Sequence, residues 1–276
     1  MDRKVYKILF WVSVIGVLTS MYLVREGIET LRFINGEWVE IYKRSNILYI
    51  SFLACINLYF YKGKKKQATL TEVLIISILG YLMYQYTGCR SGYVVLCVLC
   101  MTLLLLKIRY IYNNVIWRKM CILSPFIFLI STYLASYFYD QIYGFVYLDK
   151  ILQGRVSLGY QYINTYNMNL FGQHIFKSTD IYDYSILDSA YLDMLISYGV
   201  IFTIVWIFTT CKSIEYYYNK KEFVKVASII SYAIYGVSET FLSNCFLNVS
   251  ILLYAKWFYS TNASHCTMLK IFKSSQ

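Results

Sequence analysis

The chain has 276 residues, of which 58% are hydrophobic and only 15% carry charge. Soluble domains are usually about 45–50% apolar, so a composition this apolar, gathered in long stretches, excludes an ordinary soluble domain. The formal net charge of +11 does not indicate a nucleic-acid-binding protein, because the basic residues flank the apolar stretches and do not line one polar face.

Eight apolar stretches follow one another along the chain. They cover residues 8–24, 46–61, 70–86, 92–106, 120–139, 189–210, 223–242 and 245–259. Several are shorter than the ~20 residues of a membrane-spanning helix, but flanking Lys, Arg and Tyr side chains can reach the headgroups. The first stretch is followed by charged residues and not by a cleavage site, so we expect it to be retained. We predict an all-α, polytopic membrane protein with about eight transmembrane helices in a single domain, residues 1–276.

The distribution of basic residues predicts the orientation of these helices. With the N-terminus inside, the inner segments hold 18 Lys and Arg residues and the outer segments hold 8. Because basic residues favour the cytoplasmic side, we expect both termini in the cytoplasm. Residues 140–188, between the fifth and sixth spans, then form one long extracytoplasmic loop. This loop is rich in Tyr, Phe, Leu and Ile, so we expect it to be ordered, with a short amphipathic helix near the membrane surface.

No pattern for a metal or cofactor occurs in the sequence. It lacks a phosphate-binding Walker loop, a zinc-ligand spacing and a nucleophile elbow. Cys97 and Cys100 form a CxxC inside an apolar stretch, where we interpret them as structural residues. We therefore expect no cofactor.

Two arginines lie at predicted outer positions. Arg90 belongs to the sequence TGCRSG between the third and fourth spans, and Arg155 follows Gly154 in the long loop. A guanidinium binds two phosphate oxygens at once, so arginine suits phosphate ligands. Each residue alone is typical of a solvated side chain, but the pair would indicate a polyphosphate site if the two converge.

Two residues are candidates for a general base. A histidine can exchange protons near neutral pH, so His174 could either transfer protons or orient the loop by hydrogen bonding. Asp188 stands where the loop enters the sixth span, on one helix face with Tyr191, and could act as a base or as a helix cap. Asp193 and Glu239 lie within predicted spans, where an ionisable group usually faces a partner or a wet cavity.

Three stretches resemble the Wzy-type polymerases of capsular and exopolysaccharides, which belong with the O-antigen ligases. They are TGCRSG with the following apolar helix (Thr87–Leu106), the loop sequence LQGRVSLGYQYI…NLFGQHI (Leu152–Ile175) and LDSAYLDMLISYGVIF (Leu187–Phe202). Together they cover roughly residues 80–260. Their order and their placement on the predicted outer side carry the resemblance.

The resemblance implies a GT-C-like membrane glycosyltransferase in the bacterial plasma membrane. Its substrates would be oligosaccharide repeat units on undecaprenyl diphosphate, and its further partners would be membrane lipids, a chain-length regulator and a flippase. Arg90 and Arg155 match the family's phosphate-binding arginines. Asp188 stands where the ligase branch has a His, which makes it a base candidate with His174 as its rival, and Tyr191, Asp193 and Glu239 would support the site.

The chain also departs from the family in having only three spans before the arginine motif, as expected of a short or N-terminally truncated member. Three other readings stay open: a related ligase, a flippase or transporter of lipid-linked sugars, and a non-catalytic scaffold of a glycan assembly complex. A transporter is expected to show repeated halves and charges at the membrane midplane. Here no repeat is visible and the charges of interest lie toward the outer side.

Overall fold

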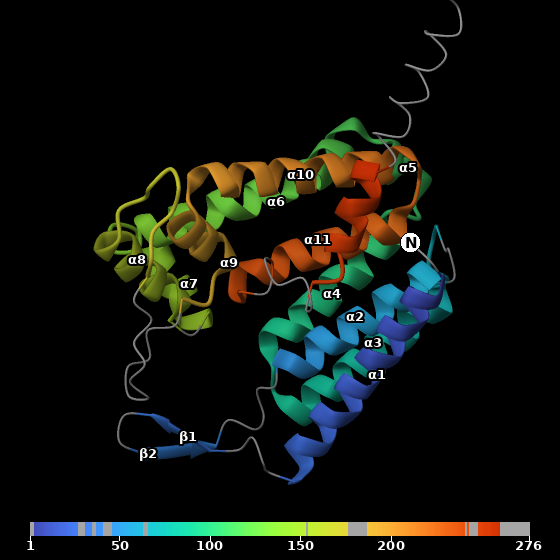
Figure 1. The fold of residues 1–276 in the computed structure, drawn as a ribbon, viewed down its shortest axis with the longest axis horizontal. Helices are drawn as coiled ribbons and strands as arrows, with labels where there is room; N and C mark the ends of the chain where they lie inside the picture. Colours follow the sequence, from blue (N-terminus) through green and yellow to red (C-terminus); the bar gives the residue numbers. More distant parts are fainter. Residues whose placement is uncertain are drawn as a thin grey trace, which may run out of the picture.

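The computed structural model describes residues 3–26, 31–34, 37–40, 46–62, 66–152, 154–175, 187–240, 242 and 248–259. These residues are helical apart from their connections and one short hairpin (Figure 1), so the predicted all-α class is confirmed at this level. The hairpin pairs β1 (Leu31–Ile34) with β2 (Glu37–Glu40) in antiparallel register and was not predicted. The longer helices are α1 (Arg3–Glu26), α2 (Asn46–Lys62), α3 (Leu70–Thr87), α4 (Arg90–Leu105), α6 (Val115–Tyr137), α10 (Val200–Asn219) and α11 (Phe223–Ser238).

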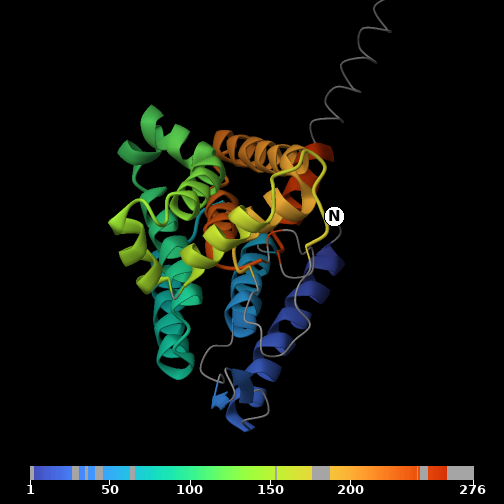
Figure 2. The same ribbon diagram turned by 90° about the vertical axis from the view of Figure 1, so that its left-hand side faces the viewer.

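Shorter elements connect the longer helices. They are α5 (Arg109–Asn113), α7 (Tyr143–Ile151), α8 (Arg155–Thr165), α9 (Ala190–Asp193), the π-helix η1 (Met194–Tyr198) and a last helical segment at residues 251–259. The described part of the predicted loop 140–188 therefore contains two short helices where we expected one. Figures 1 and 2 show α7 and α8 together at one end of the molecule, beside the start of the α9–α10 segment.

Each predicted apolar stretch overlaps a helix in the described residues, but three predicted boundaries are wrong. The eighth stretch, predicted over residues 245–259, is helical only from residue 251 among its described residues. The sixth stretch is not one continuous helix over residues 189–210. Instead α9 continues directly into the π-helix. The helix is interrupted at Gly199, whose φ is +92°, and α10 then runs from Val200 to Asn219. The seventh helix, α11, ends at Ser238 and not at residue 242, because Glu239 is extended.

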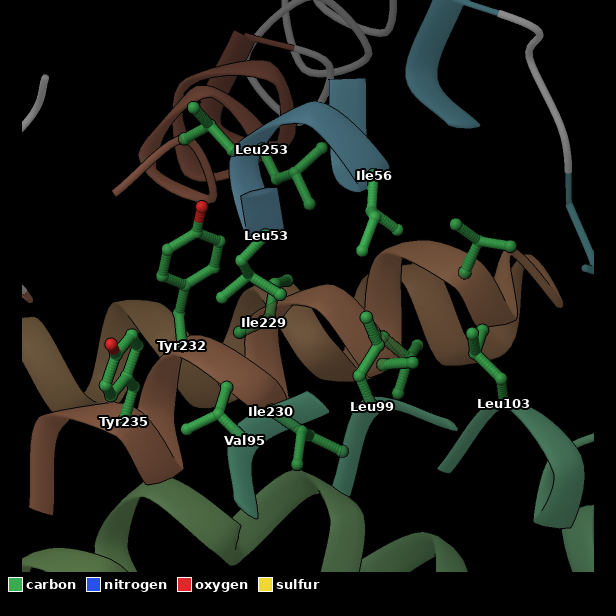
Figure 3. Close-up of a cluster of buried hydrophobic side chains, with 14 of the residues drawn as sticks. Leu53, Ile56, Val95, Leu99, Leu103, Ile229, Ile230, Tyr232, Tyr235 and Leu253 are labelled. Carbon is green, nitrogen blue, oxygen red and sulfur yellow. The ribbon is translucent and has the colours of Figure 1, made fainter. Parts of the chain in front are cut away.

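Helix α11 forms the centre of the packed core. Thirteen of its 16 residues are buried. Figure 3 shows it between α2 and residues 251–259 on one side and α4 on the other, with Tyr232 directed toward Leu53 and Leu253, and Ile230 toward Val95. The close packing of these side chains gains many van der Waals contacts, so this layer holds the helices in place.

The outer helices carry many exposed apolar side chains. One helix in the described part of the chain, α6, is long and apolar enough by length and composition to cross a membrane, and α2, α3, α4 and α11 are shorter apolar helices. On α3 the exposed apolar face includes Leu74, Ile78 and Leu82, which are between 56% and 60% exposed. Helices α6 and α10, which pack side by side (Figure 1), expose similar faces.

Candidate functional site

A cavity of about 370 Å³ lies where α4 and α8 begin and α11 ends, and we call it the arginine cavity. Arg90 and Arg155, predicted from separate motifs, both line it. Each is the first residue of its helix, so the partial positive charge of two helix N-termini adds to the two guanidinium groups. The remaining wall is mostly apolar: it consists of Gly88, Cys89, Ser91, Val94, Val95, Ile151, Leu152, Ile234, Val237 and Ser238.

Arg155 lies at the centre of the polar groups and holds two carboxylates. Its Nε donates to Asp188 Oδ2 over 3.3 Å, and its Nη2 donates to Glu239 Oε1 over 3.0 Å. The two acids differ in exposure, because the side chain of Asp188 is 41% exposed and that of Glu239 only 9%. Asp188 is therefore open to solvent beside the cavity, whereas Glu239 serves as a fixed counter-ion for Arg155; neither carboxylate lines the cavity itself.

Asp149 fixes the position of Arg155 from the neighbouring helix. Its buried carboxylate Oδ1 accepts hydrogen bonds from the backbone N–H groups of Val156 (2.8 Å) and Ser157 (3.0 Å). These are first-turn donors of α8 that have no partner within their own helix. Asp149 thus caps α8 from α7 and orients its first residue. The sequence offers no signal for this contact, because Asp149 and α8 both lie in the predicted loop 140–188.

Ser91 connects the start of α4 to the same carboxylate. Its Oγ donates to Glu239 Oε1 over 3.4 Å, so Glu239 bridges α4, α8 and the end of α11. The neighbouring Cys89 is buried, and burial raises the pKa of its thiol. A raised pKa keeps the thiol protonated at neutral pH, so Cys89 is a poor nucleophile. Within TGCRSG the sequence predicts a role for Arg90 but gives no signal for Ser91.

Two of the predicted supporting residues lie elsewhere. Tyr191 is fully buried in the core, where its hydroxyl donates to the carbonyl of Ala233 over 2.8 Å, so it holds α9 against α11. Asp193 is also buried and accepts a hydrogen bond from Ser197 Oγ over 2.8 Å within the same helical segment. Asp188 itself precedes α9, whose N-cap is Ser189, so its predicted roles as a helix-face residue and as the cap are both wrong.

His174 lies in a second cavity, the loop cavity, lined by residues 171–175 and Ser197. This cavity has an open shape with a volume of about 670 Å³, and it shares no lining residue with the arginine cavity. The histidine side chain is exposed. The structure thus brings together Arg90, Arg155, Asp188 and Glu239 and leaves His174, Asp193 and Tyr191 outside that group.

The loop beside His174 is held tightly against the π-helix. Gly172, with φ +81°, and Gly199, with φ +92°, cross so closely that a Cβ on Gly199 would lie 2.3 Å from the amide nitrogen of Gly172. The amides of Val200 and Ile201 donate to the carbonyls of Asn169 and Leu170. A side chain at either glycine would force the two segments apart.

Comparison with protein-family models, curated proteins and solved structures finds no match for this chain. In the described part of the chain, no group of three His, Cys, Asp or Glu side chains is placed to hold a metal ion.

Proposed function

We propose that the chain is a membrane glycosyltransferase that polymerises undecaprenyl-diphosphate-linked oligosaccharide repeat units on the outer face of a bacterial plasma membrane. The observation that carries this proposal is the convergence of Arg90 and Arg155 on one cavity with apolar walls. Two arginines suit a diphosphate, and side chains such as Val94 and Val237 suit the first isoprene units of its lipid.

The exposed apolar faces support a multi-pass arrangement. Large apolar patches on a water-soluble monomer rarely exceed a few hundred Å², yet α3, α6 and α10 each expose a row of large aliphatic or aromatic side chains. A bilayer is the solvent in which such faces are stable. With both termini cytoplasmic, as the basic residues predict, the arginine cavity opens on the outer side.

In the proposed reaction, a sugar hydroxyl on the incoming unit attacks C1 of the sugar that carries the growing chain. Asp188 accepts the hydroxyl proton as the new C–O bond forms, and the bond between C1 and the diphosphate oxygen breaks. The leaving group is the undecaprenyl diphosphate, whose charge Arg90 and Arg155 stabilise. Asp188 is preferred over His174 as the base because it lies in direct contact with Arg155.

Surface glycan from a host strain lacking the gene tests this proposal. Complementation with the wild-type gene should restore a ladder of glycan lengths, whereas Arg90→Ala, Arg155→Ala and Asp188→Ala should give single repeat units. Lys150→Ala is the matched control, because Lys150 is an exposed, positively charged residue of α7 that does not line the cavity. Protein amounts in the membrane are compared by immunoblot.

Three outcomes would contradict the proposal. An unchanged ladder after deletion would leave a scaffold as the better account. Accumulation of lipid-linked units on the inner leaflet would indicate a flippase. A ladder that survives all three substitutions would separate polymerase activity from the arginine cavity.

A further inference from the structure

A third cavity, separate from the arginine cavity and the loop cavity, lies between α6 and α10. It has a volume of about 410 Å³, and we call it the α6–α10 groove; its lining residues are Ile122, Leu123, Phe126, Leu129, Ile204, Ile207, Phe208, Cys211, Lys212 and Glu215. Ile204 and Phe208 are 60% and 58% exposed, so the groove opens on the outer surface of the helix pair. Apart from Lys212 and Glu215 at one end, its walls are apolar.

The polar end of the groove belongs to a basic end of the molecule. Helices α6 and α10 run antiparallel, and Arg118 near the start of α6 donates through Nη2 to Asn219 Oδ1 at the end of α10, over 2.7 Å. Residues 107–119 and 212–225, which form this end, contain eight Lys and Arg against two Glu. By the distribution of basic residues this is the cytoplasmic end.

We propose that the α6–α10 groove binds one acyl chain of an anionic phospholipid from the cytoplasmic leaflet, with Lys212 holding the lipid phosphate. This inference rests on the proposed embedding in a membrane but not on the transferase activity. An apolar groove accepts a hydrocarbon chain, and a basic end between membrane helices attracts an anionic headgroup. A second protein helix would instead leave the excess positive charge of this end without a counter-charge.

Lys212 and Glu215 should affect lipid binding in opposite directions, which gives the proposal a direct test. Lys212 Nζ donates to Glu215 Oε2 over 3.0 Å, and the same ammonium group lies 5.7 Å from the centre of the Phe208 ring. A lipid phosphate competes with Glu215 for Lys212 and is repelled by the carboxylate. Removing the lysine should therefore weaken binding of the lipid, whereas neutralising the glutamate should strengthen it.

Native mass spectrometry of the purified full chain in detergent measures this binding, with dioleoyl-phosphatidylglycerol and dioleoyl-phosphatidylcholine as probes. We expect one saturable phosphatidylglycerol adduct that phosphatidylcholine does not replace. Lys212→Gln should lower the affinity about fivefold, since one basic residue near a headgroup contributes about that much. Glu215→Gln should raise it about twofold, as expected from the loss of one helical ion pair.

Matched variants distinguish specific binding in the α6–α10 groove from non-specific contact with lipid. Ile204→Trp should fill the groove and abolish the adduct, whereas Val205→Trp should not, because Val205 is equally exposed on α10 but does not line the groove. Lys119→Gln removes one charge at the same end but no residue of the groove, so it should lower the affinity clearly less than Lys212→Gln.

Several results would overturn the proposal. They are equal binding of the two lipids, an equal loss for Lys119→Gln and Lys212→Gln, or an adduct that survives Ile204→Trp. A lipid-free dimer that Ile204→Trp dissociates would assign the groove to contact between two copies of the chain. None of these results depends on glycan polymerisation, so the failure of this inference is distinct from failure of the proposed function.

Discussion

The arginine cavity and the loop cavity each contain a residue predicted as a site residue in the loop 140–188, Arg155 and His174, yet the structure builds the two cavities differently. At the arginine cavity, residues from α4, α8 and the end of α11 are linked through contacts between residues far apart in the sequence, such as Arg155 with Glu239 and Ser91 with Glu239. At the loop cavity, the lining residue Ser197 donates to the buried Asp193 within one helical turn, and His174 is exposed. Charges that bridge several elements are expensive to assemble, so they indicate function more strongly than a polar residue on an open loop.

Replacing Arg155 should have the largest effect. Arg155→Lys keeps the charge but loses the planar fork that holds two carboxylates and a phosphate together. We expect the rate of polymer formation in host membranes to fall at least ~100-fold, as for loss of one donor in a charge-stabilising site. Wild-type activity in Arg155→Lys would show that only charge is needed there, and the comparison between the two cavities would lose its basis.

Gly199→Ala should destabilise the loop cavity without touching the arginine cavity. The added Cβ would lie 2.3 Å from the Gly172 nitrogen, at a φ that other residues rarely adopt. We expect a loss of about 2 kcal/mol, seen as a lower unfolding temperature in detergent. Gly144→Ala is the control, because the nearest atom to its Cβ is 3.9 Å away. Equal unfolding temperatures for Gly199→Ala and Gly144→Ala would mean that the close contact between Gly172 and Gly199 does not contribute to stability.

Glu239→Gln tests whether the buried carboxylate positions Arg155. The amide keeps the size and one acceptor but removes the charge that holds the guanidinium. We expect polymer formation to fall by roughly tenfold, which corresponds to the weakening of one buried charged hydrogen bond. Asp140→Asn, an exposed carboxylate on the same side that accepts from Tyr160, should change nothing. If Glu239→Gln is fully active, Asp188 alone suffices to hold Arg155.

Asp149→Ala should act on the same cavity through the helix cap. Loss of the two backbone hydrogen bonds should cost about 1 kcal/mol of stability and free the first turn of α8. Polymer formation should fall several-fold, whereas Asp149→Asn, which keeps an acceptor, should stay close to wild type. Thermal unfolding and polymer formation are measured for each variant. Equal polymer formation by Asp149→Ala and Asp149→Asn would show that the cap does not position Arg155.

His174→Ala should have the smallest effect. Its side chain lies outside the arginine cavity, so we expect less than a twofold change in polymer formation between pH 6 and pH 8. A tenfold loss, or a pH profile that disappears in the variant, would make His174 the base in place of Asp188.

The helices were predictable because apolar stretches are long and regular. Local detail was predicted less well. The hairpin strands flank the dipeptide Asn35-Gly36, the strongest short-range hairpin signal, so the hairpin was predictable from the sequence although the all-α prediction leaves it out. The break at Gly199 was visible only as a glycine inside an apolar run, which also fits a continuous helix.

The site was partly predictable for a different reason. Arg90, Arg155 and Asp188 each stand at an element boundary, where a charged residue beside apolar sequence is conspicuous. Their convergence could not be derived, because it depends on how α4, α8 and α11 pack. Tyr191 shows the opposite error: its spacing from Asp188 assumed one continuous helix, whereas Asp188 precedes α9 and Tyr191 faces the core.

The π-helix at Met194–Tyr198 makes the site tolerant of a small change in chain length. A π-turn accommodates one more residue than an α-turn, so it behaves as a one-residue insertion in the helix. Removing one residue here would let the segment continue as an α-helix, with Tyr191 kept in the core and Asp188 kept beside Arg155. Removing a second residue would shift everything before it by about 1.5 Å and rotate it by about 100°, which would turn Tyr191 out of the core and carry Asp188 away from Arg155.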